Sequence, residues 1–371
     1  MRIAFLYIAE AYQCYHAAAI ALELAARPDW TVVSYFNDPE TPHHLERVRL
    51  AYGAPPMVYR RLERSPITRA LQRGLRVFGM FKDLVMRDNA RELDSYDAVF
   101  AVEDTVATLR KLGAPHPRLI YCPHGAGDRA RGFVPSIRNF DYVLLAGPKT
   151  AERMLAKGYI HPDGYALTGS VKLETTARIS KTTNLPFKTR QPVVLYNAHK
   201  DRKLSSWRRF IEPMLDGFGQ DSSLNLIVAP HVKMFRRRRE AVREHWRQRS
   251  TPNVVIDPAS DRLLDTSYSE AADIYVGDVS SQIYEFMIRP RPCVFLNAHR
   301  LKWRDDPSFT HWHLGDVIED PADLMAAIHA APVRHALYRD RQEAMAQASL
   351  GNASPGAAVR AADAVAAFLQ R

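Results

Sequence analysis

Short apolar runs rich in β-branched and aromatic residues recur along the whole chain, with polar and helical stretches between them. Six such runs in the first half lie at residues 3–8, 31–36, 98–102, 119–122, 142–146 and 165–168. Six more in the second half lie at residues 193–197, 224–229, 254–256, 274–276, 293–296 and 316–318. Continuous apolar strands are typical of parallel sheets that are buried on both faces under crossover helices. The pattern therefore predicts two doubly wound α/β domains.

A polar segment at residues 172–191 separates the two sets of strands. It is rich in Thr, Ser and Lys and contains Pro186, as is typical of a linker. We therefore expect an N-terminal domain at residues 1–171, the linker, and a C-terminal domain at residues 192–350. The alanine-rich end at residues 351–371 has a helical apolar period, and we expect a helix there that packs back across a cleft.

Composition and length agree with two globular domains. The chain has 371 residues and is 46% apolar, which is enough to fill two hydrophobic cores. No apolar run approaches the roughly 20 residues that a membrane-spanning helix needs. Cys14, Cys122 and Cys293 lack the spacing of a zinc site or redox motif. We therefore expect a cytoplasmic protein, either free or peripheral on the inner face of the membrane.

The chain is basic, with 51 Lys and Arg against 41 Asp and Glu and a net charge of +10. Such a balance favours a polyanionic partner, which can be a phosphate compound, a nucleic acid or an anionic membrane. The four arginines at residues 236–239 have no aromatic platform, zinc spacing or helix-turn-helix pattern beside them, so a solvated helix face is the simpler interpretation. We expect no nucleic-acid partner and keep nucleic-acid binding as a distant alternative.

A second basic stretch, at residues 66–87, has apolar residues such as Ile67, Leu71 and Val85 at helical spacing among several arginines. A basic amphipathic helix of this kind suits docking on an anionic membrane surface. The same stripe equally suits a helix that packs on the protein core. The sequence leaves both interpretations open.

Two histidines follow predicted strands directly, at the sheet edge where open α/β sheets bind their ligands. His124 is followed by Gly125, and the glycine would let the backbone approach a ligand closely. Imidazole near neutral pH suits a general base, so His124 is our catalytic candidate. His231, with Lys233, could stabilise charge on a leaving phosphate. A hydrogen-bonded structural histidine and a solvated turn are the simpler alternatives.

The predicted strand at residues 274–276 runs into Asp278, and Ser280 and Ser281 stand where the next helix must begin. Hydroxyls and amides at such a position can bind a pyrophosphate, although an ordinary serine cap is the alternative. Glu285 lies on the same helix face as Ser281, where its carboxylate could accept ribose hydroxyls or simply be solvated. The residues that we expect to bind the donor are Gly125, Asn197, Lys200, Lys233, Asp278, Ser280, Ser281 and Glu285.

Taken together and in this order, these motifs resemble the CDP-glycerol glycerophosphotransferase family of teichoic-acid primases and polymerases. His124-Gly125 looks like the family's His-Gly pair, and Pro230-His231 looks like its Arg-x-His-Pro loop. The Asp278-Val-Ser-Ser281 segment looks like its Asp-x-Ser-Ser motif. The run at residues 167–172 also resembles the Gly-Asn-Pro turn of GT-B epimerases, so a nucleotide-sugar glycosyltransferase or epimerase is the alternative.

The resemblance implies a GT-B-like fold, with two Rossmann-like domains facing a central cleft. It implies a transferase that moves a glycerol-phosphate or related group from a CDP-linked donor to a hydroxyl acceptor, lipid-linked or free. Such a reaction would serve cell-envelope polymer or glycolipid synthesis. His124 would be the base and His231 would stabilise the departing nucleotide, with no metal or cofactor required.

Overall fold

The chain divides into two compact units, each of which has its own parallel sheet. The computed structural model describes residues 1–77, 80–125, 127, 132–179, 185, 187, 190–351 and 355–371, with only the backbone at 72–77. Unit 1 consists of Met1–Ala126, Arg131–Ser180 and Gln347–Arg371. Unit 2 consists of Gly127–Ala130 and Lys181–Ala346.

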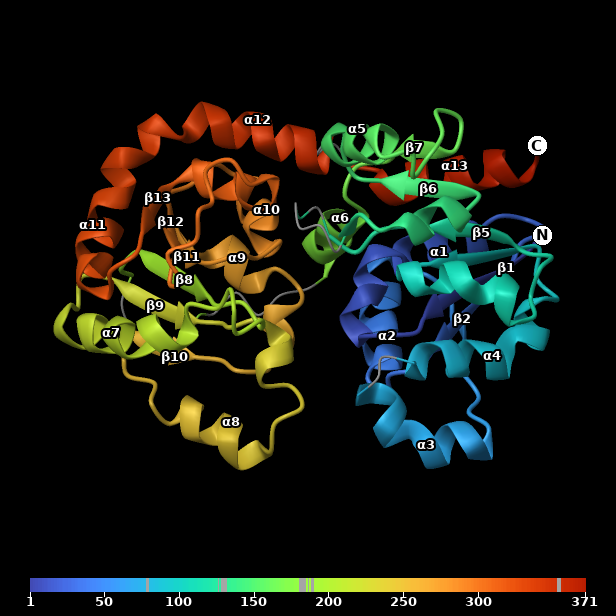
Figure 1. Ribbon diagram of the computed structural model, residues 1–371, viewed down its shortest axis with the longest axis horizontal. Coiled ribbons are helices and arrows are strands. Elements are labelled where there is room, and N and C mark those ends of the chain that lie inside the picture. Colours follow the sequence, from blue (N-terminus) through green and yellow to red (C-terminus); the bar gives the residue numbers. More distant parts are fainter. Residues whose placement is uncertain are drawn as a thin grey trace. The chain divides into compact units, whose positions relative to one another are not determined.

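Unit 1 contains a seven-stranded parallel sheet with the order β3-β2-β1-β4-β5-β6-β7 (Figure 1). Its strands are β1 (Arg2–Tyr7), β2 (Thr31–Phe36), β3 (Val58–Arg61), β4 (Ala98–Ala101), β5 (Arg118–Tyr121), β6 (Tyr142–Leu145) and β7 (Tyr165–Leu167). Strand β1 is buried from its second residue onward, because it lies between β2 and β4 and helices cover the sheet.

The helices of unit 1 come from both ends of the chain. The α-helices are α1 (Ala18–Ala25), α2 (Thr41–Ala51), α3 (Pro66–Val77), α4 (Phe81–Leu93), α5 (Pro148–Ala156), α6 (Val171–Arg178) and α13 (Ala357–Leu369). Short 3-10 helices are η1 (Ala11–His16), η2 (Asp104–Leu112) and η4 (Pro135–Asn139). Helix α13 packs against α1 and α6 through a buried, alanine-rich face.

Unit 2 contains a six-stranded parallel sheet with the order β10-β9-β8-β11-β12-β13. Its strands are β8 (Val193–Asn197), β9 (Asn225–Val228), β10 (Val254–Ile256), β11 (Ile274–Gly277), β12 (Cys293–Leu296) and β13 (Asp316–Ile318). The order of the first six strands in unit 1 is the same as in unit 2, so each sheet has the doubly wound arrangement of a dinucleotide-binding fold.

Helices of unit 2 follow its strands in the alternation expected of crossover connections. The α-helices are α7 (Trp207–Gln220), α8 (Glu240–Arg247), α9 (Ser267–Ala271), α10 (Gln282–Phe286), α11 (Leu324–Arg334) and α12 (Arg339–Leu350), whose last residues are counted with unit 1. The 3-10 helices are η5 (Val232–Met234), η6 (Asp261–Leu263), η7 (Pro307–Leu314), η8 (Pro321–Asp323) and η9 (His335–Leu337).

The predicted fold class is confirmed, and each of the predicted apolar runs overlaps a strand. Strand β3 was not predicted, because its sequence Val-Tyr-Arg-Arg is largely exposed at the sheet edge and has no apolar run. The segment predicted as a linker starts inside α6, and most of residues 180–189 lie outside the described residues.

The basic stretch at residues 66–87 forms two helices, α3 and the start of α4, where one was expected. Phe81 and Val85 on α4 are buried in the core of unit 1, whereas Ile67 and Leu71 on α3 are 68% and 52% exposed. Core packing therefore holds for the described apolar side chains of α4, whereas Ile67 and Leu71 of α3 face solvent. Among the described helices, none has both the length and the apolar composition needed to cross a bilayer.

Candidate functional site

In both sheets the strand order reverses beside the first strand of the unit, between β1 and β4 and between β8 and β11. In open α/β sheets the connections after two such strands run to opposite faces of the sheet, and ligands bind at the carboxyl ends of these strands. The residues that follow β1, β4, β8 and β11 therefore occupy the positions at which open α/β sheets bind ligands. Chemically active side chains gather there in each unit.

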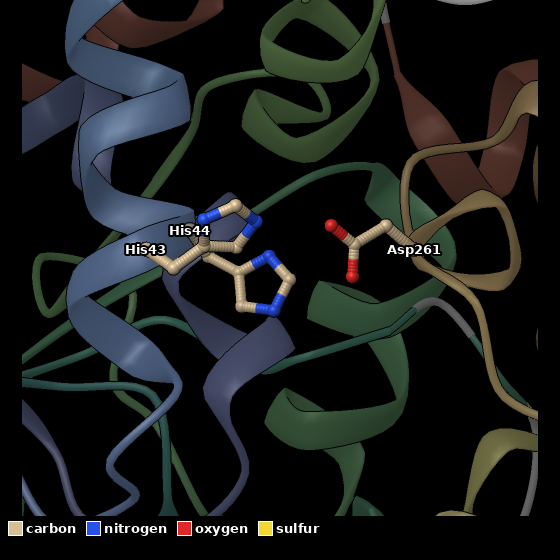
Figure 2. A group of neighbouring side chains, drawn as sticks. All are labelled: His43, His44 and Asp261. Atoms are coloured by element: carbon tan, nitrogen blue, oxygen red, sulfur yellow. The ribbon is translucent and has the colours of Figure 1, made fainter.

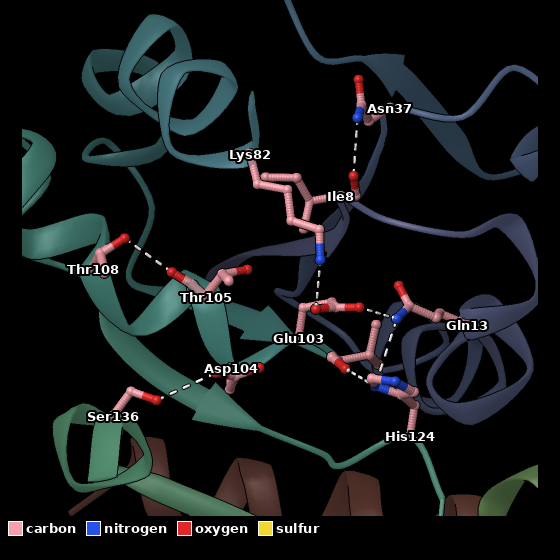
Figure 3. A network of polar contacts seen from close by, with 11 residues as sticks. Ile8, Gln13, Asn37, Lys82, Glu103, Asp104, Thr105, Thr108, His124 and Ser136 are labelled. Atoms are coloured by element: carbon pink, nitrogen blue, oxygen red, sulfur yellow. Dashed lines mark hydrogen bonds and ion pairs between the residues drawn. The ribbon is translucent and has the colours of Figure 1, made fainter. Parts of the chain in front are cut away.

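In unit 1, His124 follows β5, the neighbour of β4, and its side chain is exposed. Its Nδ1 atom lies 2.8 Å from the carbonyl oxygen of Val102 (Figure 3). A carbonyl oxygen can only accept, so Nδ1 carries the proton and Nε2 of the neutral ring keeps its lone pair. His124 is thus held in the tautomer that a general base requires at Nε2. Its neighbour Gly125 has a φ of +124°, a conformation that favours glycine.

Next to His124, Glu103 follows β4 and is only 7% exposed. One of its oxygens accepts from Lys82 Nζ at 2.7 Å, and the other accepts from Gln13 Nε2. Gln13, in η1 after β1, also places Nε2 3.5 Å from His124 Nδ1 (Figure 3). His124 therefore lies beside a buried ionic network at the carboxyl ends of the strands of unit 1.

In unit 2, His199 follows β8 and His231 follows β9, with their ring centroids 5.9 Å apart. The Nδ1 atom of His231 accepts from the backbone N–H of Lys233 at 3.1 Å. His199 Nδ1 likewise accepts from the backbone N–H of Asp201 at 3.0 Å. Because Nδ1 accepts in both rings, the neutral imidazoles carry their proton on Nε2. His231 is therefore a hydrogen-bond donor at Nε2, the reverse of His124.

His231 is held neutral by its surroundings. Burial, followed by the charges of Lys200, His199 and Lys233, lowers the pKa of His231 to about 3. The ring is therefore neutral above about pH 4 and acts through its N–H group rather than as a cation. Lys200 and Lys233 supply the positive charge, so the predicted residues His231, Lys200 and Lys233 lie together in a group suited to an anion such as a phosphate.

Asp278 follows β11 and is completely buried. Its carboxylate accepts from the backbone N–H groups of His199 at 2.8 Å and Ser206 at 2.7 Å, and from Ser206 Oγ at 2.9 Å. Its backbone carbonyl accepts from Trp312 Nε1 at 3.0 Å. These bonds fix the loop after β8, which carries His199 and Lys200. They favour a positioning role for Asp278 over the direct donor contact that we predicted.

The other predicted donor residues of unit 2 have less uniform surroundings. Asn197 ends β8, is 1% exposed and donates to the carbonyl of Ala229 at 2.7 Å, while its buried Oδ1 has no hydrogen-bond partner among the described residues. Ser280 is buried and its Oγ accepts from Gln282 N at 3.3 Å. Ser281 is exposed and precedes α10 without a side-chain cap, and Glu285 is half-buried on that helix.

The predicted phosphate-binding helix end is weaker than expected. Helix α10 has only five residues, so few peptide dipoles align behind Ser281. The alternative of an ordinary serine cap does not hold for Ser281, because its side chain makes no capping bond to this helix. Donor binding by Ser280, Ser281 and Glu285 remains a prediction.

Sequence reasoning missed several residues of these clusters. Glu103 was visible only as a polar residue after a strand, Gln13 lies in a 3-10 helix without a motif, and Lys82 was noted only as part of the basic stretch at residues 66–87. Ser206 and Trp312, which hold Asp278, carried no local signal either. Each of these residues depends on contacts between segments far apart in the sequence.

Histidines of α2 lie outside the predicted set. Figure 2 shows His43 and His44 on α2 of unit 1 and Asp261 at the start of η6 of unit 2. His44 is buried, and its Nδ1 lies 2.8 Å from the hydroxyl of Tyr15, which also accepts from Arg47 at 2.9 Å. This bonding ties α2 to η1, so His44 has a structural role.

Solved structures share this arrangement of two parallel sheets. The UDP-GlcNAc 2-epimerase from Neisseria meningitidis, bound to UDP-GlcNAc, is 14% identical over 99% of this chain and 100% of its own, with a TM-score of 0.65. The S. aureus MnaA–UDP structure is 13% identical over 100% and 97% of the two chains, with a TM-score of 0.64. The wall teichoic acid polymerase TagF, soaked with CDPG, is 12% identical over 100% and 88%, with a TM-score of 0.66.

These likenesses show a GT-B-like fold for the chain, shared with proteins that are enzymes. No protein-family model matches the chain. No curated protein sequence matches it either.

Proposed function

We propose that this chain is a GT-B transferase that moves a glycerol-phosphate or related group from a CDP-linked donor to a hydroxyl acceptor. The observation that carries the proposal is the pair of opposite tautomers, with a basic Nε2 on His124 and an Nε2–H donor on His231. A transfer reaction needs both, because one group must take a proton while another stabilises the charge that leaves. The polymerase TagF, whose structure was solved with CDPG, is among the structural neighbours.

The chemistry assigns one task to each side chain. His124 Nε2 takes the proton of the acceptor hydroxyl as its oxygen attacks the β-phosphorus of the donor. The new P–O bond forms while the bond between this phosphorus and the oxygen bridging to the α-phosphate breaks, and CMP departs with the electron pair. His231 donates its Nε2 proton as a hydrogen bond to that phosphate, and Lys200 and Lys233 balance its charge.

A ligand panel followed by a transfer assay tests this function. Thermal unfolding is measured with CDP-glycerol, CDP, UDP-GlcNAc and UDP, and CDP-linked ligands should stabilise the chain most, by about 2.7 kcal/mol at 100 times Kd. His124→Ala should then lower the rate of transfer by roughly 100- to 10,000-fold while the stabilisation by donor persists. The matched control, His161→Ala, removes an exposed histidine of unit 1 and should keep wild-type activity.

The panel also decides the main alternative. Two of the structural neighbours described above are a UDP-GlcNAc 2-epimerase and a protein in complex with UDP, which favours a nucleotide-sugar glycosyltransferase or epimerase as the second candidate. A larger stabilisation by UDP-GlcNAc or UDP than by the CDP compounds would reject the CDP-linked donor. Activity of His124→Ala within a few-fold of wild type would remove His124 from the mechanism.

We further propose that unit 1 docks on a membrane surface, where the acceptor is found. Ile67 and Leu71 are exposed on α3, and Arg61, Arg69 and Arg87 are exposed nearby in the sequence. Apolar side chains beside arginines suit an anionic membrane surface, where a lipid-linked hydroxyl acceptor would be found. This docking supports a peripheral location on the inner face of the membrane.

A further inference from the structure

The carboxylate of Glu103 is held on both oxygens by side chains from two other elements of unit 1. Lys82, near the start of α4, lies 2.7 Å from Oε2, and Gln13, in η1, donates to Oε1 (Figure 3). Glu103 and Gln13 are both buried, at 7% and 0% exposure. A buried carboxylate that accepts hydrogen bonds on both oxygens is held in one orientation, whereas the partners of an ion pair on the surface move freely.

This position leaves Glu103 ionised beside His124. Burial raises the pKa of Glu103, because a charge is poorly solvated inside a protein. The charge that His124 carries when it is protonated, the charge of Lys82 and the hydrogen bonds from Lys82 and Gln13 outweigh burial, so the pKa of Glu103 lies below its usual value. At neutral pH the network therefore contains a fixed negative charge.

We propose that Glu103 is the positioning residue that sets the proton affinity of His124, and that Lys82 moderates it. The inference rests on the proposed function in taking His124 as the base. When Nε2 receives the proton of the acceptor hydroxyl, the ring becomes an imidazolium, and a neighbouring carboxylate stabilises that charge. Glu103 does not take the proton, because the other ring proton, on Nδ1, remains bonded to the carbonyl of Val102.

His16 and Asp104 are further titratable groups near His124. His16, in η1, has its ring centroid 6.4 Å from that of His124. Burial, followed by the charges of Lys172 and His124, lowers the pKa of His16 well below its usual value, so this ring is neutral at neutral pH. Asp104, which follows Glu103 in the chain, accepts from Ser136 Oγ at 3.3 Å (Figure 3). The test changes Glu103 and Lys82, because these two charges belong to the hydrogen-bonded network that reaches His124 through Gln13.

The test is an NMR titration of the His124 ring in the full chain without ligand. Histidine is isotopically labelled, and the His124 signal is assigned by its loss in His124→Gln. Glu103→Gln keeps the side-chain shape and removes the charge, and should move the titration midpoint of His124 down by about one pH unit. Lys82→Met should move the midpoint up, because the positive charge of Lys82 then no longer offsets the negative charge of Glu103 at the His124 ring.

Shifts in opposite directions distinguish an electrostatic role from loosened packing, which would not depend on the sign of the charge removed. Unchanged midpoints, or shifts of the same sign in both variants, would overturn the inference. The side chain of Lys82 is 31% exposed, so Lys82→Met should fold even if Glu103→Gln does not, and a His124 midpoint that fails to rise in Lys82→Met would then overturn the inference. No donor is needed, so a failure of CDP-linked donors to bind leaves this measurement intact, and unchanged midpoints leave the donor question open.

Discussion

At the scale of single residues, two histidines differ in which ring nitrogen carries the proton, because different backbone groups face their Nδ1 atoms. A carbonyl oxygen faces Nδ1 of His124, whereas a backbone N–H faces Nδ1 of His231. The first partner makes Nε2 an acceptor and the second makes it a donor. Both histidines follow a strand, so their position in the sequence alone does not distinguish a base from a stabilising group.

The neutral state of His231 makes a prediction about stability and pH. Its pKa is about 3 in the folded chain and about 6.5 in an unfolded one. Between these values the unfolded chain binds more protons, so this histidine's contribution to stability falls as the pH falls through 6.5. From pH 6.5 to pH 4.5 we expect wild type to lose about 2 to 3 kcal/mol of unfolding free energy relative to His231→Gln.

Urea unfolding of both proteins at several pH values measures this difference. His161→Gln, which replaces an exposed histidine of unit 1, should follow wild type throughout and serves as the control. A gap between wild type and His231→Gln that stays constant from pH 6.5 to pH 4.5 would show that His231 titrates normally, and its role as a neutral donor would have to be abandoned.

At the scale of elements, the end of the chain is tied to unit 1 by a close approach of two backbones. Gly147 precedes α5, and a Cβ atom there would lie 2.5 Å from the carbonyl oxygen of Ala348 and 2.8 Å from the backbone nitrogen of Gly351. Gly351 has a φ of +69° and meets Ala146 from the other side. Small residues on both segments therefore let the last turn of α12 and Gly351 lie against the strand-to-helix turn between β6 and α5.

Gly147→Ala should destabilise the chain, because backbone atoms cannot move aside as a flexible side chain can. We expect a loss of about 1 to 3 kcal/mol in unfolding free energy, as in other overpacked sites. Gly219→Ala is the matched control, since nothing lies within 4 Å of its added Cβ and the residue is in α7. Alanine in that helix should stabilise by roughly 0.5 to 1 kcal/mol.

Denaturant unfolding of the two variants beside wild type gives both values. Equal effects of the two substitutions would mean that the close contact at Gly147 does not exist in solution.

At the scale of the whole molecule, the net charge of +10 is large enough to direct the protein toward anionic surfaces. Charge alone gives weak, salt-dependent binding to an anionic membrane, and stable binding also needs apolar side chains that insert into the interface. Helix α3 supplies both, because Ile67 and Leu71 are exposed and Arg69 lies between them in the sequence. A peripheral enzyme with a lipid-linked acceptor would use such a surface.

Co-sedimentation with liposomes of rising anionic lipid content tests this surface. Wild type should pellet increasingly at low salt, and Ile67→Ser combined with Leu71→Ser should stay in the supernatant, because the apolar contact is lost. Leu50→Ser is the control, since Leu50 is 63% exposed on α2, outside the basic stretch. Wild type that remains in the supernatant at every lipid composition would favour a soluble acceptor.

The sequence by itself determined the two α/β units and the strand-end positions of His124 and His231. Parallel strands buried on both faces must be apolar throughout, so the local pattern reports them directly. Strand β3 was not predicted, because an exposed edge strand does not need an apolar sequence. Composition also located the basic stretch at residues 66–87, but not that Ile67 and Leu71 would be exposed on α3 while Phe81 and Val85 are buried on α4.

Only the tertiary structure decided what surrounds the candidate residues. Gln13 and Glu103 are 90 positions apart, and Asp278 is 72 positions from Ser206, yet each pair is hydrogen-bonded. The tautomers of His124 and His231 depend on which backbone group faces Nδ1. These contacts follow from the order in which strands join a sheet, and burial then sets the charge state of each group. Strand order and burial are properties of the folded chain, so no local pattern along the sequence encodes them.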